Sequence, residues 1–181
     1  MREQKSTSSG TATAEMPNAH LHEPFIDGLK DIYDAEKQLV KAIPKLIKAA
    51  TSQSLKDGLT HHLHETEGHV TRLETAFESI GESAKAKMCP VMKGLVEEGG
   101  EATKQKDTNS RDAAIIAAAQ KVEHYEIATY GTLRAWAEAM GHDQAAQLLS
   151  DTLDEEKAAD EKLTEIAEEG CGCSKDEADN D

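Results

Sequence analysis

Apolar residues recur at intervals of three and four along four long stretches of the chain. This spacing places them on one face of an α-helix. The stretches cover about residues 24–50, 54–80, 109–140 and 143–168. We predict a helix for each, with a kink or a missing backbone hydrogen bond at Pro44 inside the first. The apolar stripe predicted for the second helix consists of Leu55, Leu59, Leu63, Val70, Leu73 and Phe77.

The connections between the stretches indicate how the helices pair. Very short turns join the first helix to the second and the third to the fourth, so each pair forms an antiparallel hairpin. The middle connection has about 28 residues, with a short amphipathic piece around 91–98 that Gly99-Gly100 should end. Asn109 and Ser110 are good caps for the helix that follows. Two hairpins with one long crossover predict an all-α, ferritin-like four-helix bundle over residues 23–169.

Composition supports an all-helical chain and excludes several function classes. Aromatic residues are only 3% of the 181 residues, whereas sheets favour aromatic and β-branched side chains. The formal net charge of −15 repels phosphates, so we expect neither nucleic acid nor an anionic membrane as a partner. No apolar run approaches the roughly 20 residues that cross a bilayer, and residues 1–14 lack the apolar stretch of a signal peptide. We expect a cytoplasmic protein.

Both ends of the chain lack a helical apolar period. We predict a disordered tail over residues 1–22, which are rich in Ser, Thr, Gly and Ala, and a disordered acidic tail over 170–181. Three cysteines do not make a disulfide framework. Cys171 and Cys173 in the second tail could bind a soft metal, form a strained disulfide or remain exposed to solvent.

Every helix interrupts its apolar stripe with acidic residues near its middle. A buried carboxylate costs several kcal/mol unless it is paired or bound to a metal. Two divalent cations would neutralise such a cluster, and carboxylates with imidazoles suit iron or manganese. We therefore predict a carboxylate-bridged dinuclear metal site. Its candidate ligands are Glu36, His62, Glu65, Glu123, Glu126, Glu156 and Asp160.

The alternatives for these residues are ordinary surface positions. Glu36 could pair with the nearby Lys37 and Lys41, and the other acids could lie at the exposed edge of a stripe. His62 could bind a metal ion directly, or it could contact a side chain that does. His69 is a weaker candidate than His62.

Three segments resemble the YciE/YciF family of ferritin-like proteins. They are Asp31-Ile-Tyr-Asp-Ala-Glu-Lys-Gln-Leu39, Ala118-Ala-Gln-Lys-Val-Glu-His-Tyr-Glu-Ile-Ala128 with Tyr130-Gly-Thr-Leu133, and Thr152-Leu-Asp-Glu-Glu-Lys-Ala-Ala-Asp160. The resemblance covers about residues 23–169. It implies a bundle related to rubrerythrin, a homodimer, and an association with bacterial stress responses.

The chain departs from the ferritin and rubrerythrin pattern in one respect. Those proteins supply Glu-x-x-His from the second and fourth helices, whereas the fourth helix here offers Glu156-x-x-x-Asp160 without a histidine. The metal position at that helix is then expected to be all-oxygen. The rubredoxin-type Cys-x-x-Cys module of full rubrerythrins is also absent from the sequence.

Three functions follow from these observations. The first is a di-iron or di-manganese oxidoreductase that acts on a small oxidant such as peroxide or dioxygen. The second is a non-catalytic stress protein with a structural or vestigial metal site, which the missing histidine favours. Iron storage in a ferritin cage is third, because the family that the chain resembles forms dimers.

Overall fold

The computed structural model describes residues 17–171 and gives no side-chain detail for Cys171. Residues 1–16 and 172–181, which include Cys173 and belong to the two predicted tails, lie outside the described residues. Within the described part, residues 17–22 do not continue as a tail: a 3₁₀ turn at Ala19–Leu21 leads directly into the first helix. The described elements are that turn and five helices, and this part of the chain holds no strand.

The helices follow the predicted order, with somewhat different ends. Their bounds are α1 His22–Ala49, α2 Gln53–Ser79, α3 Pro90–Ala102, α4 Thr108–Met140 and α5 Asp143–Cys171. Helix α1 continues through Pro44. Helix α3 is longer than predicted and passes through Gly99-Gly100. Gly99 packs against α1: a Cβ built on it would lie 3.7 Å from Leu46 Cδ2, an ordinary packing distance.

Local side chains and glycines fix where the hairpins turn. Ser52 caps α2 by accepting a hydrogen bond from the backbone N–H of Leu55 at 3.3 Å. The cap of α4 is Asp107, which accepts from the N–H of Ser110 at 2.8 Å; the predicted caps Asn109 and Ser110 lie inside the helix. Gly141, with φ 77°, ends α4 in the left-handed conformation that favours glycine.

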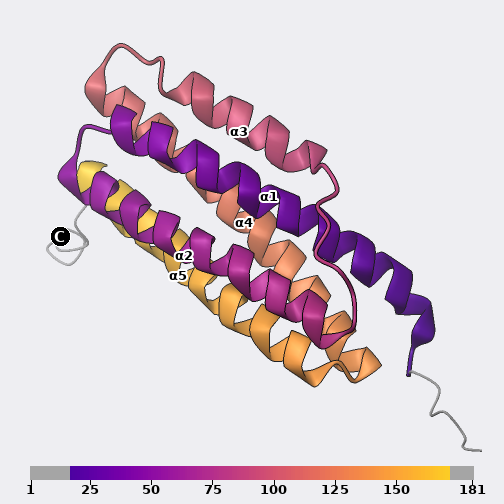
Figure 1. Ribbon diagram of the computed structural model, residues 1–181. Helices are drawn as coiled ribbons and strands as arrows, with labels where there is room; N and C mark the ends of the chain where they lie inside the picture. The colour runs from indigo at the N-terminus through magenta and orange to yellow at the C-terminus, as the bar shows by residue number, and fades with distance from the viewer. Residues whose placement is uncertain (1–16, 172–181) are drawn as a thin grey trace, which may run out of the picture.

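The four long helices form a bundle of two hairpins, as predicted. Helix α1 packs along α2, α4 packs along α5, and the hairpins meet through α2 with α5 and through α1 with α4 (Figure 1). The crossover from Ile80 to Asp107 carries α3, which lies outside the bundle against α1 and α4 (Figure 1). None of the helices within residues 17–171 is long and apolar enough to span a membrane.

A carboxylate on the second hairpin holds the turn of the first. Asp112 on α4 accepts hydrogen bonds from the N–H of Thr51 at 2.8 Å, from the Thr51 hydroxyl at 2.7 Å and from the N–H of Ser52 at 2.7 Å. These bonds outweigh the effect of partial burial and lower the pKa of Asp112 below its ordinary value. The two hairpins are thereby aligned at one end of the bundle.

Candidate metal centre

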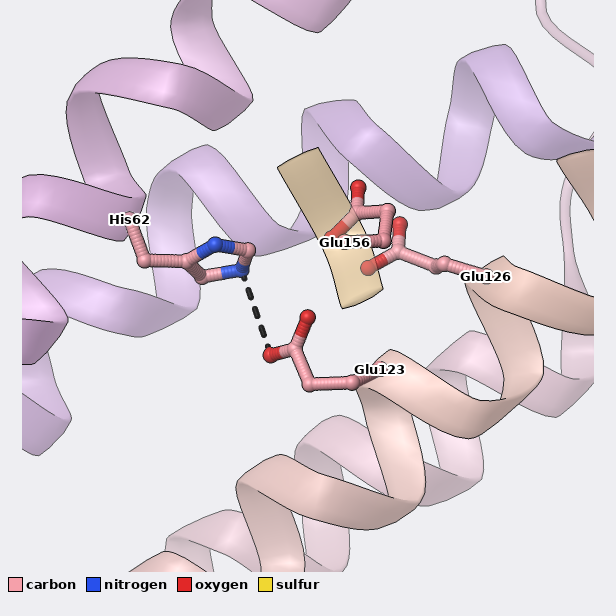
Figure 2. A group of neighbouring side chains, drawn as sticks. All are labelled: His62, Glu123, Glu126 and Glu156. Atoms are coloured by element: carbon pink, nitrogen blue, oxygen red, sulfur yellow. Dashed lines mark ion pairs between the residues drawn. The ribbon is translucent and has the colours of Figure 1, made fainter. Parts of the chain in front are cut away.

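Six buried side chains converge between the two hairpins in two groups that share one carboxylate. The first group contains His62, Glu123, Glu126 and Glu156, and Figure 2 shows the three carboxylates and the imidazole turned toward one another. The second group contains Glu36, His69 and again Glu156. In each group, one possible ligand atom per residue lies within 4.8 Å of the others. All six residues belong to the buried class.

Helical spacing explains why these residues meet. Glu123 and Glu126 are three residues apart on α4, so they project from the same face. His62 and His69 are seven residues apart on α2, which is two turns, and the buried Thr66 lies between them on the same face. Both histidines therefore face the core, one above the other.

Several atoms in the cluster are buried without any hydrogen bond. Both carboxylate oxygens of Glu126 and both of Glu156 lack one, as do Oε2 of Glu123 and both ring nitrogens of His62. His69 Nδ1 lies 3.0 Å from Glu156 Oε1, also without hydrogen-bond geometry. Buried polar atoms are almost always satisfied in native proteins, and unpaired buried charge is costly. This donor set fits metal ions, because each unpaired atom is a metal ligand by type.

Carboxylates repel one another in the absence of metal, which shows in the pKa values. Burial raises the pKa of Glu123 and Glu126 well above the ordinary value, and the nearby carboxylates raise it further. Burial alone would lower the pKa of His69, but the adjacent Glu156 and Glu36 outweigh it and raise the pKa to about 10. A metal ion that displaced these protons would make the site's affinity rise with pH.

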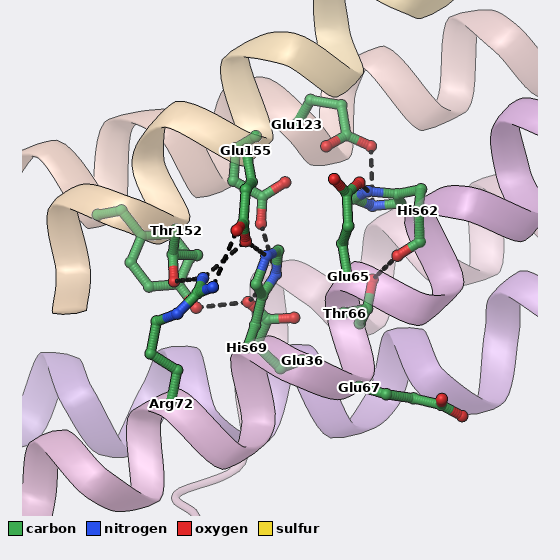
Figure 3. Close-up of polar contacts among 12 residues, drawn as sticks. Glu36, His62, Glu65, Thr66, Glu67, His69, Arg72, Glu123, Thr152 and Glu155 are labelled. Carbon is green, nitrogen blue, oxygen red and sulfur yellow. Dashed lines mark hydrogen bonds and ion pairs between the residues drawn. The ribbon is translucent and has the colours of Figure 1, made fainter.

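A second layer of polar contacts supports His69 from behind (Figure 3). His69 Nε2 lies 2.8 Å from Glu155 Oε2, and Arg72 donates two hydrogen bonds to the Glu155 carboxylate, at 2.6 and 2.9 Å. Arg72 also donates to the Thr152 hydroxyl at 2.8 Å. When the His69 ring is neutral, an ionised Glu155 favours the remaining proton on Nε2, so that the Nδ1 lone pair is directed at the cluster. Tyr130, whose ring centroid lies 6.4 Å from that of His69, donates a hydrogen bond to Glu36.

Five of the seven predicted ligands lie in the two groups: Glu36, His62, Glu123, Glu126 and Glu156. Glu65 and Asp160 belong to neither. The Glu65 side chain is 21% exposed, and its carboxylate lies 3.2 Å from the exposed His61. Asp160 is 22% exposed, with Oδ2 lying 3.4 Å from the exposed His124.

His69 is a stronger candidate ligand in the structure than its place in the sequence indicated. The predicted stripe of α2 passed through Leu63 and Val70, which are only half-buried, whereas the buried face passes through His62, Thr66 and His69. Tracing the stripe as 55, 59, 62, 66, 69 and 73 would have shown this, because every step is three or four residues. The expectation of an all-oxygen position at the fourth bundle helix, α5, is wrong, because His69 lies beside Glu156. Both histidines come from α2.

Comparisons with known proteins identify relatives of the whole bundle. The model of a family described as a domain of unknown function, DUF892, matches residues 20–173. Protein YciF of Escherichia coli (strain K12) is 48% identical over 149 residues, which cover 81% of this chain and 90% of YciF. The crystal structure of that E. coli stress protein superposes with a TM-score of 0.82 at 45% identity, covering 85% of this chain and 98% of YciF.

A more distant solved structure shares the fold alone. It is a ferritin-like, diiron-carboxylate protein from Bacillus anthracis str. Ames, with a TM-score of 0.63 and 17% identity, covering 82% of this chain and 98% of that one. The predicted fold and the predicted family resemblance are both confirmed by these matches. The chain belongs to the DUF892 family and is a ferritin-like homologue of the stress protein YciF.

Proposed function

We propose that this protein binds two divalent metal ions, iron or manganese, in a carboxylate-bridged site, and that it is a stress protein whose site reacts with peroxide or dioxygen. The observation that carries the proposal is the pair of buried donor groups sharing Glu156. Four carboxylates and two neutral imidazoles balance two divalent cations, because the four negative charges of Glu36, Glu123, Glu126 and Glu156 equal the four positive ones.

The residues divide between the two ions as follows. His62, Glu123 and Glu126 would hold one ion, Glu36 and His69 would hold the other, and Glu156 would bridge them. The α2 histidines supply one nitrogen donor to each ion. This arrangement resembles the carboxylate-bridged sites of ferritin-like bundles, although it takes both histidines from one helix.

When bound, a pair of iron or manganese ions supplies redox chemistry that no side chain of this cluster has by itself. The protein's own part is to hold the donors and to exclude bulk water. Glu36, Glu126 and Glu156 have no exposed surface. The Tyr130 hydroxyl donates a hydrogen bond to the Glu36 carboxylate and so fixes the orientation of that side chain. Glu155 and Arg72 fix the orientation of His69 in the same way.

Cellular context forms part of the proposal. The similarity to the E. coli stress protein supports a role in a bacterial stress response. We further propose a homodimer in the cytoplasm, with a small oxidant as the partner of the site. Size-exclusion chromatography with light scattering would separate a dimer of the 19.6 kDa chain from a monomer or a cage.

A non-catalytic metal site is the second candidate. The complete burial of Glu36 and Glu156 favours it, since a structural metal needs no open coordination position. Such a site would stabilise the bundle and leave peroxide unchanged.

The deciding experiment is elemental analysis of protein purified without chelators, beside a Glu36→Ala/Glu126→Ala double variant. Glu67→Ala is the matched control, because that carboxylate is 58% exposed and lies outside both groups. About two metal ions per chain, retained in the control and lost in the double variant, are expected. Peroxide consumption by the loaded protein then separates the redox function from the structural one. No metal after purification and none after anaerobic reconstitution would refute both functions.

A further inference from the structure

We propose that a pocket between α2 and α5 binds a small uncharged molecule with an apolar body and one oxygen-containing end, and that it presents this end to the metal position at His62 and Glu123. The proposal rests on the dinuclear site proposed above and adds the class of molecule that reaches it. Alcohols and alkyl hydroperoxides belong to this class.

The pocket has a volume of about 230 Å³, which suits a molecule much smaller than a drug. Its apolar walls include Leu59, Leu163 and Ile166. Both helices contribute small residues to its lining, Gly58 from α2 and Ala159 from α5. A Cβ at position 58 would already lie 3.1 Å from Ile166 Cδ1, so a larger side chain there would crowd the pocket.

Polar groups of the candidate metal site form part of the pocket wall. His62 and Glu123 both line it, and their side chains are only 9% and 1% exposed. Neither ring nitrogen of His62 has a hydrogen bond, and neither does Oε2 of Glu123. An apolar pocket with a few convergent polar groups is the usual form of a small-molecule site. A ligand with one polar end can satisfy these atoms, or meet the metal ion that they hold.

Charge selects an uncharged ligand. Glu126, Glu156 and Glu36 lie behind Glu123, so an anion entering the metal-free pocket meets a cluster of carboxylates. With two divalent ions bound, the four carboxylates are balanced. Lys162, a cation that lines the pocket, already pairs with Glu165 at 2.8 Å, and Glu65 in the same lining is acidic, so an anion gains little for the cost of leaving water. An uncharged molecule is not repelled by the carboxylates, and it does not lose the hydration of a charge when it enters the pocket.

The opposite end of the cluster is closed by the contacts described above. There Glu155 lies against His69 Nε2 and is itself held by Arg72, so side chains already occupy that approach (Figure 3). The two metal positions therefore differ. The His62 position opens toward a pocket, and the His69 position is covered by an ion pair.

Cyclohexanol is a suitable probe, and the test follows amide chemical shifts of ¹⁵N-labelled full-length protein during its addition. Saturable shifts at Gly58, Ala158 and Ala159 are expected, with a Kd on the order of 1–10 mM for so small a ligand. Cyclohexanecarboxylate, which has the same ring with a charge, should bind at least about tenfold more weakly. In Co²⁺-loaded protein, the proton on the hydroxyl-bearing carbon should relax faster than those on the far side of the ring.

Ala159→Phe should weaken cyclohexanol binding at least about tenfold by filling the pocket. Ala158→Phe is a second blocking variant, because the exposed Ala158 carries little risk of misfolding. The matched control is Ala135→Phe, at an exposed position on α4 that lines none of the described pockets.

Metal stoichiometry measured on the same samples separates the two proposals. Two Co²⁺ per chain without saturable cyclohexanol shifts would overturn the pocket and leave the metal site. Cyclohexanol binding that both blocking variants leave unchanged would also overturn the pocket. Cyclohexanol binding without any Co²⁺ uptake would refute the dinuclear site and, with it, the orientation of the ligand toward a metal.

Discussion

Replacement of Glu126 by glutamine should stabilise the metal-free protein and abolish the first metal position. Both Glu126 oxygens are buried without a hydrogen bond, and burial together with the charges of Glu36, Glu156 and Glu123 raises its pKa well above the ordinary value. The folded protein must therefore keep this carboxyl protonated, or bury it charged, at pH 7. Protonating a carboxyl of ordinary pKa at that pH costs about 3–4 kcal/mol, which is the upper limit of the penalty.

Glutamine has the same shape and no charge, so the Glu126→Gln protein avoids this penalty. Its amide remains unpaired, as the protonated carboxyl is, so that cost cancels approximately. We expect a gain of about 2 kcal/mol in the free energy of unfolding, because neighbouring carboxylates also relax once one charge is gone. For a bundle of this length that gain raises Tm by about 4–8 °C.

The assay is thermal unfolding followed by circular dichroism, in EDTA and at saturating Mn²⁺. In EDTA at pH 7 the variant should melt above the wild type, and the difference should shrink toward pH 5, where the wild-type carboxyl protonates at little cost. In Mn²⁺ the order should reverse, since a ligand at 100 times its Kd stabilises the wild type by about 2.7 kcal/mol. Glu67→Gln is the matched control, because its carboxylate is 58% exposed.

A metal-free Glu126→Gln protein that melted below the wild type in EDTA would refute the claim that buried Glu126 destabilises the metal-free fold. That result would mean that the native carboxylate has a stabilising partner in the metal-free fold. An equal shift in Glu67→Gln would show that overall charge, and not burial, sets the effect.

Three further predictions concern the surroundings of the site. The free energy of unfolding of the metal-free protein, measured with urea, should fall as pH rises from about 6.5 to 10. The folded-state pKa of His69 is about 10, above the ordinary 6.5, so the stability that protonated His69 contributes is complete below pH 6.5 and is lost as pH rises through 10. The raised pKa of Glu123 acts in the same direction. A flat profile over that range would contradict the coupling. Glu155→Gln should lower metal affinity about 10–100-fold in a competition titration, because His69 loses the carboxylate that orients it, and unchanged affinity would remove Glu155 from the site. Asp112→Ala should lower the free energy of unfolding by about 1–3 kcal/mol in chemical denaturation, because two backbone N–H groups at the first hairpin turn lose their acceptor, while metal stoichiometry stays unchanged.

The bundle could be predicted from the sequence because the features that define it lie in short stretches of the chain. Apolar spacing marks each helix, and the lengths of the connections decide between hairpin and crossover. The errors in the fold concern ends and packing. Asp107 caps α4 in place of Asn109, and α3 continues past Gly99, which packs near Leu46 of α1. The latter contact joins distant parts of the chain, and residue spacing along one helix does not contain it.

The acidic part of the candidate site was visible in the sequence for the same reason. Glu36, Glu126 and Glu156 interrupt apolar stripes, and the structure buries all three. His69 was underrated because Leu63 and Val70 offered a more apolar path along α2 than the true buried face. Glu155, next to the candidate ligand Glu156, contributes through its contacts with His69 and Arg72 on α2, which only the three-dimensional arrangement shows.

The two hairpins contribute equally to the cluster, and this determines when during synthesis the proposed metal pair could bind. Glu36, His62 and His69 belong to the first hairpin, whereas Glu123, Glu126 and Glu156 belong to the second. Each donor group draws on both, so neither metal position is complete until the ribosome has released the chain beyond residue 156. A nascent first hairpin therefore holds only part of each donor group. A metal pair bound as proposed would be a reversible cross-link between the two halves of the polypeptide, and the two hairpins would be held together less firmly when metal is scarce.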